Sequence, residues 1–283
     1  MAKLLRTLIG RVTAGEDLSR EEMALAVDAM VSGELEEGEI AILLTALSAK
    51  GETTDEVAGA AAALRRRMTP IRTTRSGLVD TCGTGGDHSG TFNISTAAAL
   101  VTAAAGVPVA KHGNRSITSK SGSADVLTEL GVHVEADVTA VEACIDRLGI
   151  GFCFAPLLHP AMRRVAAVRR KLGVPTIFNL LGPLCNPASA DYQLLGVGRA
   201  ELRPLLAGAL SQLDAPRALV VCGEDGLDEV SLSAPTRVTE VHAGELREFR
   251  WVPADFGLRE APIDALKVNG PKESAAVIRE ILA

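Results

Sequence analysis

Apolar residues recur at helical spacing through residues 1–70. Leu4, Leu8 and Val12 would share one helix face, and further amphipathic stretches follow. Ser19 and Thr53 each precede an acidic first turn, which is typical of a helix start. We therefore predict four short helices, over residues 4–12, 19–32, 37–50 and 53–67. Their apolar faces exceed what four short helices can bury among themselves, which favours a self-associating surface.

The pattern changes from Leu78 onward, where short apolar runs alternate with helical stretches of similar length. The runs predict strands over residues 78–80, 107–110, 151–155, 192–197, 218–222 and 237–242. The intervening stretches predict helices over residues 96–105, 124–130, 138–148, 159–172 and 201–213, with a last helix over 272–282. Such alternation predicts a mostly parallel sheet with helical crossovers.

Composition narrows the class of protein. Hydrophobic residues make up 47% of the 283 residues, enough for a substantial core, while aromatic residues make up only 3%. The formal net charge of −6 opposes wholesale nucleic-acid binding. No apolar run reaches about 18 residues, and no signal peptide is evident, so we expect no membrane association. The five scattered cysteines lack a zinc-binding spacing and predict reduced thiols in the cytoplasm.

The stretch over residues 79–125 holds the chemistry. The first predicted strand of the sheet leads into GTGGD (residues 83–87), and a helix begins near Asn93–Thr96. Glycines let backbone N–H groups approach a ligand, and a helix N-terminus attracts anions. The turn favours a phosphate site, although an ordinary strand–helix turn has the same local pattern.

A second polar cluster follows the next strand. KHGNR (residues 111–115) would leave the same sheet edge as GTGGD, and several hydroxyl residues follow it. Ligands of open α/β sheets bind at the carboxyl ends of strands. Cations, amides and hydroxyls together at one edge favour a polyanionic ligand. The alternative is a flexible Ser/Gly linker, but the segment is short and a linker would not need its positively charged residues.

Asp228 and Glu229 follow the strand predicted over residues 218–222. Adjacent carboxylates on a loop are usually only solvated. Beside a pyrophosphate they become candidate Mg²⁺ ligands, because Mg²⁺ is held by few carboxylates together with substrate phosphates.

Six motifs, taken together and in this order, resemble the anthranilate phosphoribosyltransferase family. They are GTGGD (83–87), NIST (93–96), KHGNR (111–115), SKSGSAD (119–125), FNLLGPLCNP (178–187) and DEVS (228–231). The resemblance implies an α/β fold class with a small N-terminal all-helical domain and a larger α/β domain with a mostly parallel central sheet, as in nucleoside phosphorylases and phosphoribosyltransferases. The helical domain would cover residues 1–72 with a returning segment at about 160–186, and the α/β domain would cover 73–159 and 187–283.

The implied reaction belongs to tryptophan biosynthesis. It transfers the phosphoribosyl group of phosphoribosyl pyrophosphate to the amine of anthranilate and releases pyrophosphate. The resemblance also implies two Mg²⁺ ions and a homodimer formed through the helical domain. It implies no acid–base or nucleophilic catalytic residue, which agrees with the lack of an evident triad and favours positioning of a neutral amine nucleophile. The family continues past the position of Ala283, so we expect part of the α/β domain to be absent.

The resemblance assigns site residues one by one. Residues for phosphoribosyl pyrophosphate would be Gly83, Gly86, Asp87, Thr91, Asn93, Ile94, Ser95, Thr96, Lys111, His112, Gly113, Asn114, Arg115, Ser116, Ile117, Thr118, Ser119 and Ser123. Residues for anthranilate would be Gly83, Asn114, His159 and Arg169. Metal ligands would be Ser95, Asp228 and Glu229.

Three alternatives remain at this point. A pyrimidine nucleoside phosphorylase-like enzyme shares the expected fold, but KHGNR, SKSGSAD and the two carboxylates argue against it. A non-catalytic relative that binds nucleic acid would need a basic groove, which the net charge of −6 opposes. An inactive truncated scaffold is the third alternative.

Overall fold

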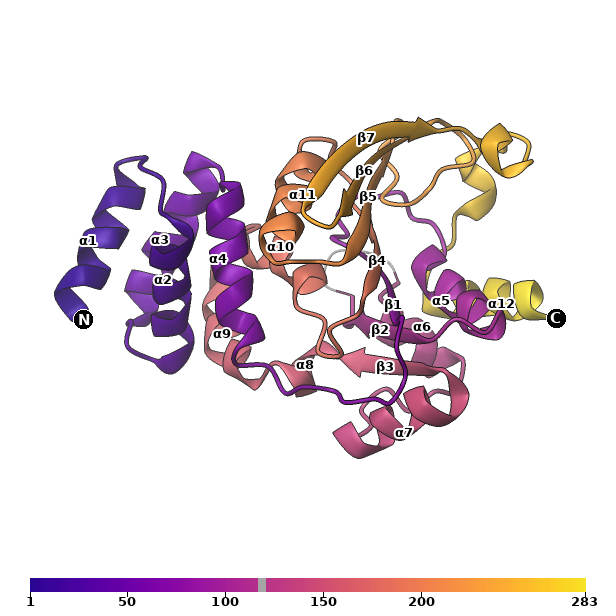
Figure 1. The fold of residues 1–283 in the computed structure, drawn as a ribbon, viewed down its shortest axis with the longest axis horizontal. Helices are drawn as coiled ribbons and strands as arrows, with labels where there is room; N and C mark the ends of the chain where they lie inside the picture. Colours follow the sequence, from indigo (N-terminus) through magenta and orange to yellow (C-terminus); the bar gives the residue numbers. More distant parts are fainter. Residues whose placement is uncertain (117–120) are drawn as a thin grey trace.

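The computed structural model of the protein describes residues 1–116 and 121–283. Helices of the N-terminal part form a bundle at one end of the molecule, and a sheet with its helices forms the other end (Figure 1). The bundle consists of α1 (Ala2–Thr13), α2 (Arg20–Ser32), α3 (Glu37–Lys50) and α4 (Thr54–Arg65). The predicted helix starts are confirmed, because Ser19 with Glu22 and Thr53 with Glu56 form capping boxes.

A twisted α/β unit follows the bundle. Within the described residues, seven strands form one sheet in the order β3-β2-β1-β4-β5-β6-β7. The strands are β1 (Val79–Gly83), β2 (Val109–Gly113), β3 (Ile150–Phe154), β4 (Tyr192–Gly196), β5 (Arg217–Gly223), β6 (Thr236–His242) and β7 (Glu245–Trp251). Pairs from β3 through β5 are parallel, and β6 and β7 are added antiparallel, so the mostly parallel sheet is confirmed.

In the described residues, six helices of this unit lie close to their predicted positions, and two four-residue helices over residues 155–158 and 178–181 were not predicted. They are α5 (Ile94–Ala104), α6 (Ser123–Glu129), α7 (Val138–Leu148), α8 (Ala155–Leu158), α9 (Arg163–Leu172), α10 (Phe178–Leu181), α11 (Leu202–Gln212) and α12 (Pro271–Leu282). Short 3₁₀ turns cover Pro160–Met162, Gly182–Leu184, Pro253–Phe256 and Ile263–Leu266. None of the helices in the described residues is long and apolar enough to cross a membrane.

Strand β7 is an element that the sequence prediction missed. It pairs with β6 through a two-residue turn, Ala243-Gly244, in which both residues have positive φ (49° and 83°). The alternating pattern of EVHAGELREF around this turn is the signal for a hairpin, because two-residue turns of this kind match the twist of paired strands.

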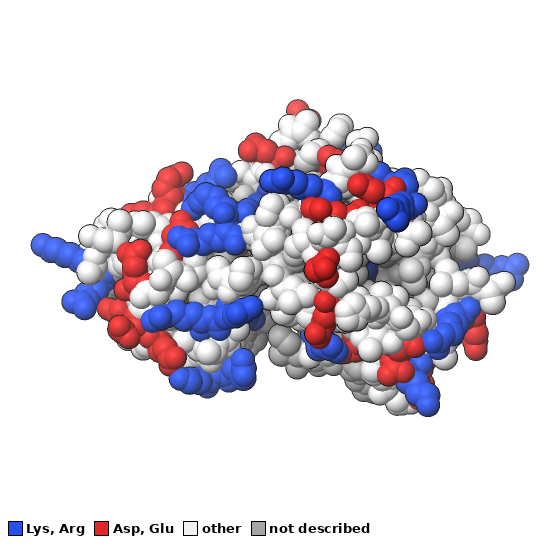
Figure 2. Space-filling view, turned by 90° about the horizontal axis from the view of Figure 1, so that it is seen from below, with Lys and Arg blue, Asp and Glu red and all other residues white. Residues whose placement is uncertain are grey.

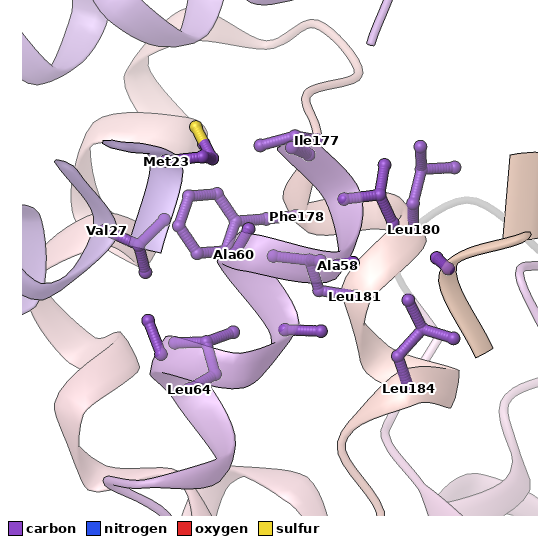
Figure 3. Close-up of a cluster of buried hydrophobic side chains, with 14 of the residues drawn as sticks. Met23, Val27, Ala58, Ala60, Leu64, Ile177, Phe178, Leu180, Leu181 and Leu184 are labelled. Atoms are coloured by element: carbon purple, nitrogen blue, oxygen red, sulfur yellow. The ribbon is translucent and has the colours of Figure 1, made fainter. Parts of the chain in front are cut away.

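One hydrophobic core joins the bundle to the sheet. Buried residues of α2 and α4 belong to the same cluster as residues of α10, α11, β4 and β5. Figure 3 shows the side chain of Phe178 beside Val27 and Ala60, so α10 packs directly onto the bundle. Arg65, at the end of α4, donates from Nε to the carbonyl of Leu184 at 2.6 Å. The bundle therefore fixes the backbone that leads into the sheet.

Candidate active site

A cavity of about 510 Å³ opens at the carboxyl ends of β1 and β2. Strand β1 lies between β2 and β4, and all three run parallel. The loops after these strands must therefore meet at one edge, as expected for an open α/β sheet. GTGGD follows β1, KHGNR ends β2, and the loop after β5 reaches the same cavity with Asp228 and Glu229.

The N-terminus of α5 faces this cavity. Asn93 is the N-cap, and its Oδ1 accepts hydrogen bonds from the backbone N–H of Thr96 at 3.0 Å and from the Ser95 hydroxyl at 3.2 Å. The carbonyl of Ser95 accepts a hydrogen bond from Thr81 of β1 at 2.8 Å, which ties the helix start to the central strand. A capped helix N-terminus at a cavity wall favours an anionic ligand.

Lys111 places a buried cation beside that helix start. Its side chain is almost fully buried, and Nζ donates to the Thr81 carbonyl at 2.5 Å and to the Ser95 hydroxyl at 3.2 Å. Burial lowers the pKa of Lys111, and the opposite charge of Asp80, which is fully buried in β1, acts against that lowering. Asp80 accepts a hydrogen bond from the backbone N–H of His112 at 3.1 Å.

Three carboxylates, Asp87, Asp228 and Glu229, line the same cavity, and Glu229 accepts a hydrogen bond from the backbone N–H of Ser95. Burial, followed by the charge of Asp87, raises the pKa of Asp228 to about 7. Burial and the charge of Asp228 raise the pKa of Glu229 to about 8. Near pH 7, Asp228 and Glu229 are therefore partly protonated, and a bound cation would replace these protons.

Two glycines make room for Asp228. A Cβ on Gly83 would lie 2.8 Å from the Asp228 Oδ2 atom, and a Cβ on Gly196 would lie 1.6 Å from the Asp228 carbonyl oxygen. These residues are also paired across β1 and β4. Only glycine at both positions lets the loop lie flat on the strand ends, so the strands themselves set the position of the carboxylate.

The donor set fits Mg²⁺ held jointly with a phosphate ligand. The described residues contain no group of three or more His, Cys, Asp or Glu side chains that could hold a metal ion by themselves. However, the carboxylates of Asp228 and Glu229 repel each other, and Asp87 Oδ2 is buried without a hydrogen-bond partner. Mg²⁺ takes few protein carboxylates and completes its shell with water and substrate phosphates.

His112 and His159 form a buried pair at the base of the cavity. Their Nε2 atoms lie 3.2 Å apart, and His112 Nδ1 lies 3.0 Å from the Gly182 carbonyl. A carbonyl can only accept, so a neutral His112 carries its proton on Nδ1 and offers Nε2 as an acceptor toward His159. Burial lowers the pKa of His112 to about 4, and burial together with His112 lowers the pKa of His159 to about 3. Both rings are therefore neutral near pH 7.

Arg169 differs from the other basic residues of α9. Its guanidinium donates to Asn179 Oδ1 at 3.1 Å and lies over the ring of Phe178, 5.7 Å from the centroid. All three residues line the cavity, whereas Arg163 and Arg170 are exposed and are not among its lining residues. Because Phe178 packs against the helical bundle, the bundle supports this wall of the cavity.

The structure brings most of the predicted site residues together. Those lining the cavity are Gly83, Asp87, Thr91, Asn93, Ile94, Ser95, Lys111, His112, Gly113, Asn114, Arg115, Ser116, Ser123, Arg169, Asp228 and Glu229. Gly86, Thr96 and His159 are neighbours of lining residues and are not themselves in the wall. Ile117, Thr118 and Ser119 lie outside the described residues.

Several residues near or in the cavity were not selected from the sequence, among them Phe178, Asn179 and Asp80. Phe178 and Asn179 stand in the FNLLGPLCNP motif, so that motif was the available signal. Asp80 has no comparable signal, because an acidic residue inside an apolar strand does not reveal that its neighbour is a buried lysine.

Family models match nearly the whole chain. Residues 75–283 match the a/b domain of a glycosyl transferase family, and residues 6–68 match the helical bundle domain of that family. Anthranilate phosphoribosyltransferase from Pelotomaculum thermopropionicum is 50% identical over 279 residues, which cover 99% of this chain and 81% of the relative. The enzyme of the same name from Rhodopirellula baltica is 52% identical, over 96% of this chain and 80% of the relative.

Solved structures agree with these relatives. The crystal structure of anthranilate phosphoribosyltransferase from Thermus thermophilus has a TM-score of 0.90 and 48% identity, over 97% of this chain and 82% of that chain. The enzyme from Saccharomyces cerevisiae, in complex with phosphoribosyl pyrophosphate and Mg, has a TM-score of 0.88 and 30% identity, over 98% of this chain and 80% of that chain.

Proposed function

The chain belongs to the anthranilate phosphoribosyltransferase family of tryptophan biosynthesis, and we propose that the central cavity carries out the transfer with the residues assigned below. One observation supports this assignment above all others. Lys111, the N-terminus of α5 and three carboxylates line one cavity, and Glu229 lies close enough to interact with both Lys111 and Ser95. Such an arrangement can hold a pyrophosphate together with Mg²⁺: the cationic groups would bind the phosphate oxygens, and the carboxylates would bind the metal ion.

Residues around the start of α5 would bind phosphoribosyl pyrophosphate. GTGGD would offer backbone N–H groups, and Ser95, Lys111 and the loop around Asn114 would offer side-chain donors. Cleavage of the bond between ribose C1 and pyrophosphate builds positive charge on the ribose and negative charge on the leaving group. Lys111 and the N-terminus of α5 line the same cavity and would stabilise that negative charge in the transition state.

Asp228, Glu229 and Ser95 would hold Mg²⁺ with the phosphate oxygens of the substrate, and we propose two ions. Bound Mg²⁺ would neutralise charge that develops on the pyrophosphate. The S. cerevisiae relative was solved with phosphoribosyl pyrophosphate and Mg, which supports the same pairing of ligands here. Gly83 and Gly196 keep the Asp228 loop against the strand ends, so the chain itself presents this carboxylate to the cavity.

Arg169 would bind the carboxylate of anthranilate, with Gly83 and Asn114 nearby and His159 behind His112. Both histidines are neutral near pH 7, so neither would protonate the amine and remove its nucleophilic lone pair. The amine needs no activation by a strong base. The cavity would therefore act mainly by positioning the amine against ribose C1.

Several broader features are part of the same proposal. Leu4 and Ile42 expose about half of their surface on the helical bundle (48% and 50%), which supports a homodimer formed through that bundle. The contacts of α9 with α2 and α3 support the returning segment at about 160–186 as part of a helical domain over 1–72, with the α/β domain over 73–159 and 187–283. All five cysteines are free thiols, which supports a cytoplasmic location.

Surface charge gives little support to a nucleic-acid ligand. On the face shown in Figure 2, acidic and basic side chains are intermixed over both the bundle and the sheet. Several of the basic residues are in ion pairs, such as Arg66 and Arg67 with Asp28, and Lys171 with Glu37. Pairing of this kind leaves less free positive charge for a phosphate backbone.

Anthranilate fluorescence provides the test of the proposal. We expect fluorescence to fall on addition of phosphoribosyl pyrophosphate, and only when Mg²⁺ is present, because the leaving group needs its charge neutralised. A phosphorylase would instead consume a pyrimidine nucleoside with phosphate, and a nucleic-acid-binding relative would bind DNA in a salt-dependent manner without turnover. No loss of fluorescence with all components present would contradict the proposed reaction for this chain.

Replacement of Arg169 by alanine should raise KM for anthranilate about 10–100-fold, the cost of one charge-assisted hydrogen bond in a partly buried site. KM for phosphoribosyl pyrophosphate should change much less, because Lys111 and α5, which would bind that substrate, belong to other elements of the cavity wall. Arg170→Ala is the matched control, since Arg170 is the exposed neighbour on the same helix. Equal effects of the two substitutions would show that α9 acts only through its overall charge.

A further inference from the structure

Residues 90–93, which lead into α5, are held in place by a segment far along the chain. The backbone N–H of Phe92 donates to the carbonyl of Leu266 at 2.8 Å, and the N–H of Val268 donates to the carbonyl of Gly90 at 2.9 Å. Thr91 forms an antiparallel bridge with Lys267 between these two bonds. The entry to the helix is therefore held by an isolated β-bridge, and its partner segment precedes α12 by only a few residues.

Ser274 of α12 completes this attachment. Its side chain is fully buried, and its hydroxyl oxygen accepts a hydrogen bond from the backbone N–H of Asn93 at 2.9 Å. The remaining polar groups of Asn93 are also engaged, because Oδ1 caps α5 and Nδ2 donates to the Ser121 carbonyl at 3.1 Å. Ser274 does not line the cavity, so its hydrogen bond attaches Asn93 to a part of the protein behind the cavity wall.

Apolar packing supports the same contact. Phe92 and Ala97 from the start of α5 belong to one buried cluster with Val268, Ala275 and Ile278. Figure 1 shows α12 lying beside α5 and α6, at the opposite end of the molecule from the bundle. Movement of α12 would therefore be transmitted to Asn93 and to the residues that it caps.

We infer that Ser274 is a positioning residue for the phosphate site, acting through Asn93 on the N-terminus of α5. The inference rests on the proposed role of α5 in binding phosphoribosyl pyrophosphate. Ser95 and the first N–H groups of α5 take their direction from the Asn93 cap. A small displacement of binding groups is costly, because the ligand must meet Lys111 and these groups at the same time.

Ser274→Ala tests the inference. Alanine preserves the helix and removes only the hydroxyl, so we expect KM for phosphoribosyl pyrophosphate to rise about tenfold while KM for anthranilate stays nearly constant. Hydrogen exchange at the Asn93 amide, measured without substrate, should become faster. Ile278→Val is the matched control, because it trims the same buried cluster one turn later on α12 and leaves the Asn93 bond intact.

The outcomes separate the inference from the proposed function. Unchanged exchange at Asn93 in Ser274→Ala, or an equal rise of KM in Ile278→Val, would overturn the positioning role. Faster exchange with unchanged KM would overturn it as well, and Asn93→Ala would then decide the proposed function. Weaker binding of phosphoribosyl pyrophosphate by Asn93→Ala keeps the α5 site, whereas unchanged binding rejects it.

Discussion

Asparagine in place of Asp228 should give a protein that is more stable without Mg²⁺ and far less active with it. The substitution keeps the side-chain shape that fits against Gly83, leaves the backbone contact with Gly196 unchanged, and removes one charge from the carboxylate cluster. Turnover should fall by about 10²–10³, because the proposed Mg²⁺ ligand is lost. The melting temperature in EDTA should rise by about 2–4 °C for each kcal/mol of repulsion removed.

The sign of the pH dependence follows from the raised pKa values. Asp228 and Glu229, with pKa values raised to about 7 and about 8, keep protons in the folded protein at pH values where the unfolded chain has lost them. Folding therefore binds protons, and stability falls as the pH rises from about 5 through 8. Saturating Mg²⁺ should reduce this fall, since a bound cation favours the ionised carboxylates.

Thermal unfolding between pH 5.5 and 9 in EDTA checks this prediction. The wild-type melting temperature should decline more steeply toward alkaline pH than that of Asp228→Asn. Asp264→Asn serves as the control, because Asp264 is an exposed carboxylate whose pKa is lowered by a hydrogen bond from Lys267. Parallel pH profiles for wild type and Asp228→Asn would show that the carboxylates do not repel each other in the folded protein.

The sheet edge could be predicted because it depends on local patterns and on one general rule. GTGGD and KHGNR each follow a short apolar strand, and helical crossovers make those strands parallel. Their loops must then share an edge whatever the exact strand order. The position of the Asp228 loop depends on the strand order, which the pattern did not predict. Strand β5 lies next to β4, so the loop after β5 passes over Gly196 to the end of β1.

Roles that depend on distant partners could not be predicted. Arg65, Arg169 and Arg170 all stand in basic helix ends, and nothing in their spacing shows that Arg65 bonds the carbonyl of Leu184 while Arg170 is exposed. Ser274 is a small polar residue in an amphipathic helix, which a sequence pattern would assign to solvent. Its burial against Asn93 comes from tertiary packing, which local periodicity does not contain.

Replacement of Lys111 by methionine should lower kcat/KM for phosphoribosyl pyrophosphate by about 10²–10³, the typical cost of removing one oriented donor from developing negative charge. Methionine has a similar length and no charge, so the cavity wall keeps its shape. The variant should also be less stable, because Asp80 is fully buried and loses the nearby cation that opposes its burial. Steady-state kinetics and thermal unfolding of the purified variant measure the two effects.

A second substitution separates the role of Lys111 in folding from its role in catalysis. Asp80→Asn in the Lys111→Met background removes the unpaired buried charge and retains an acceptor for the His112 backbone N–H. The double variant should therefore recover much of the lost stability and none of the lost activity. If activity returns with stability, then Lys111 serves the fold by balancing Asp80. If only stability returns, the charge of Lys111 acts on the leaving pyrophosphate, and this catalytic role is separate from the pairing of Lys111 with Asp80.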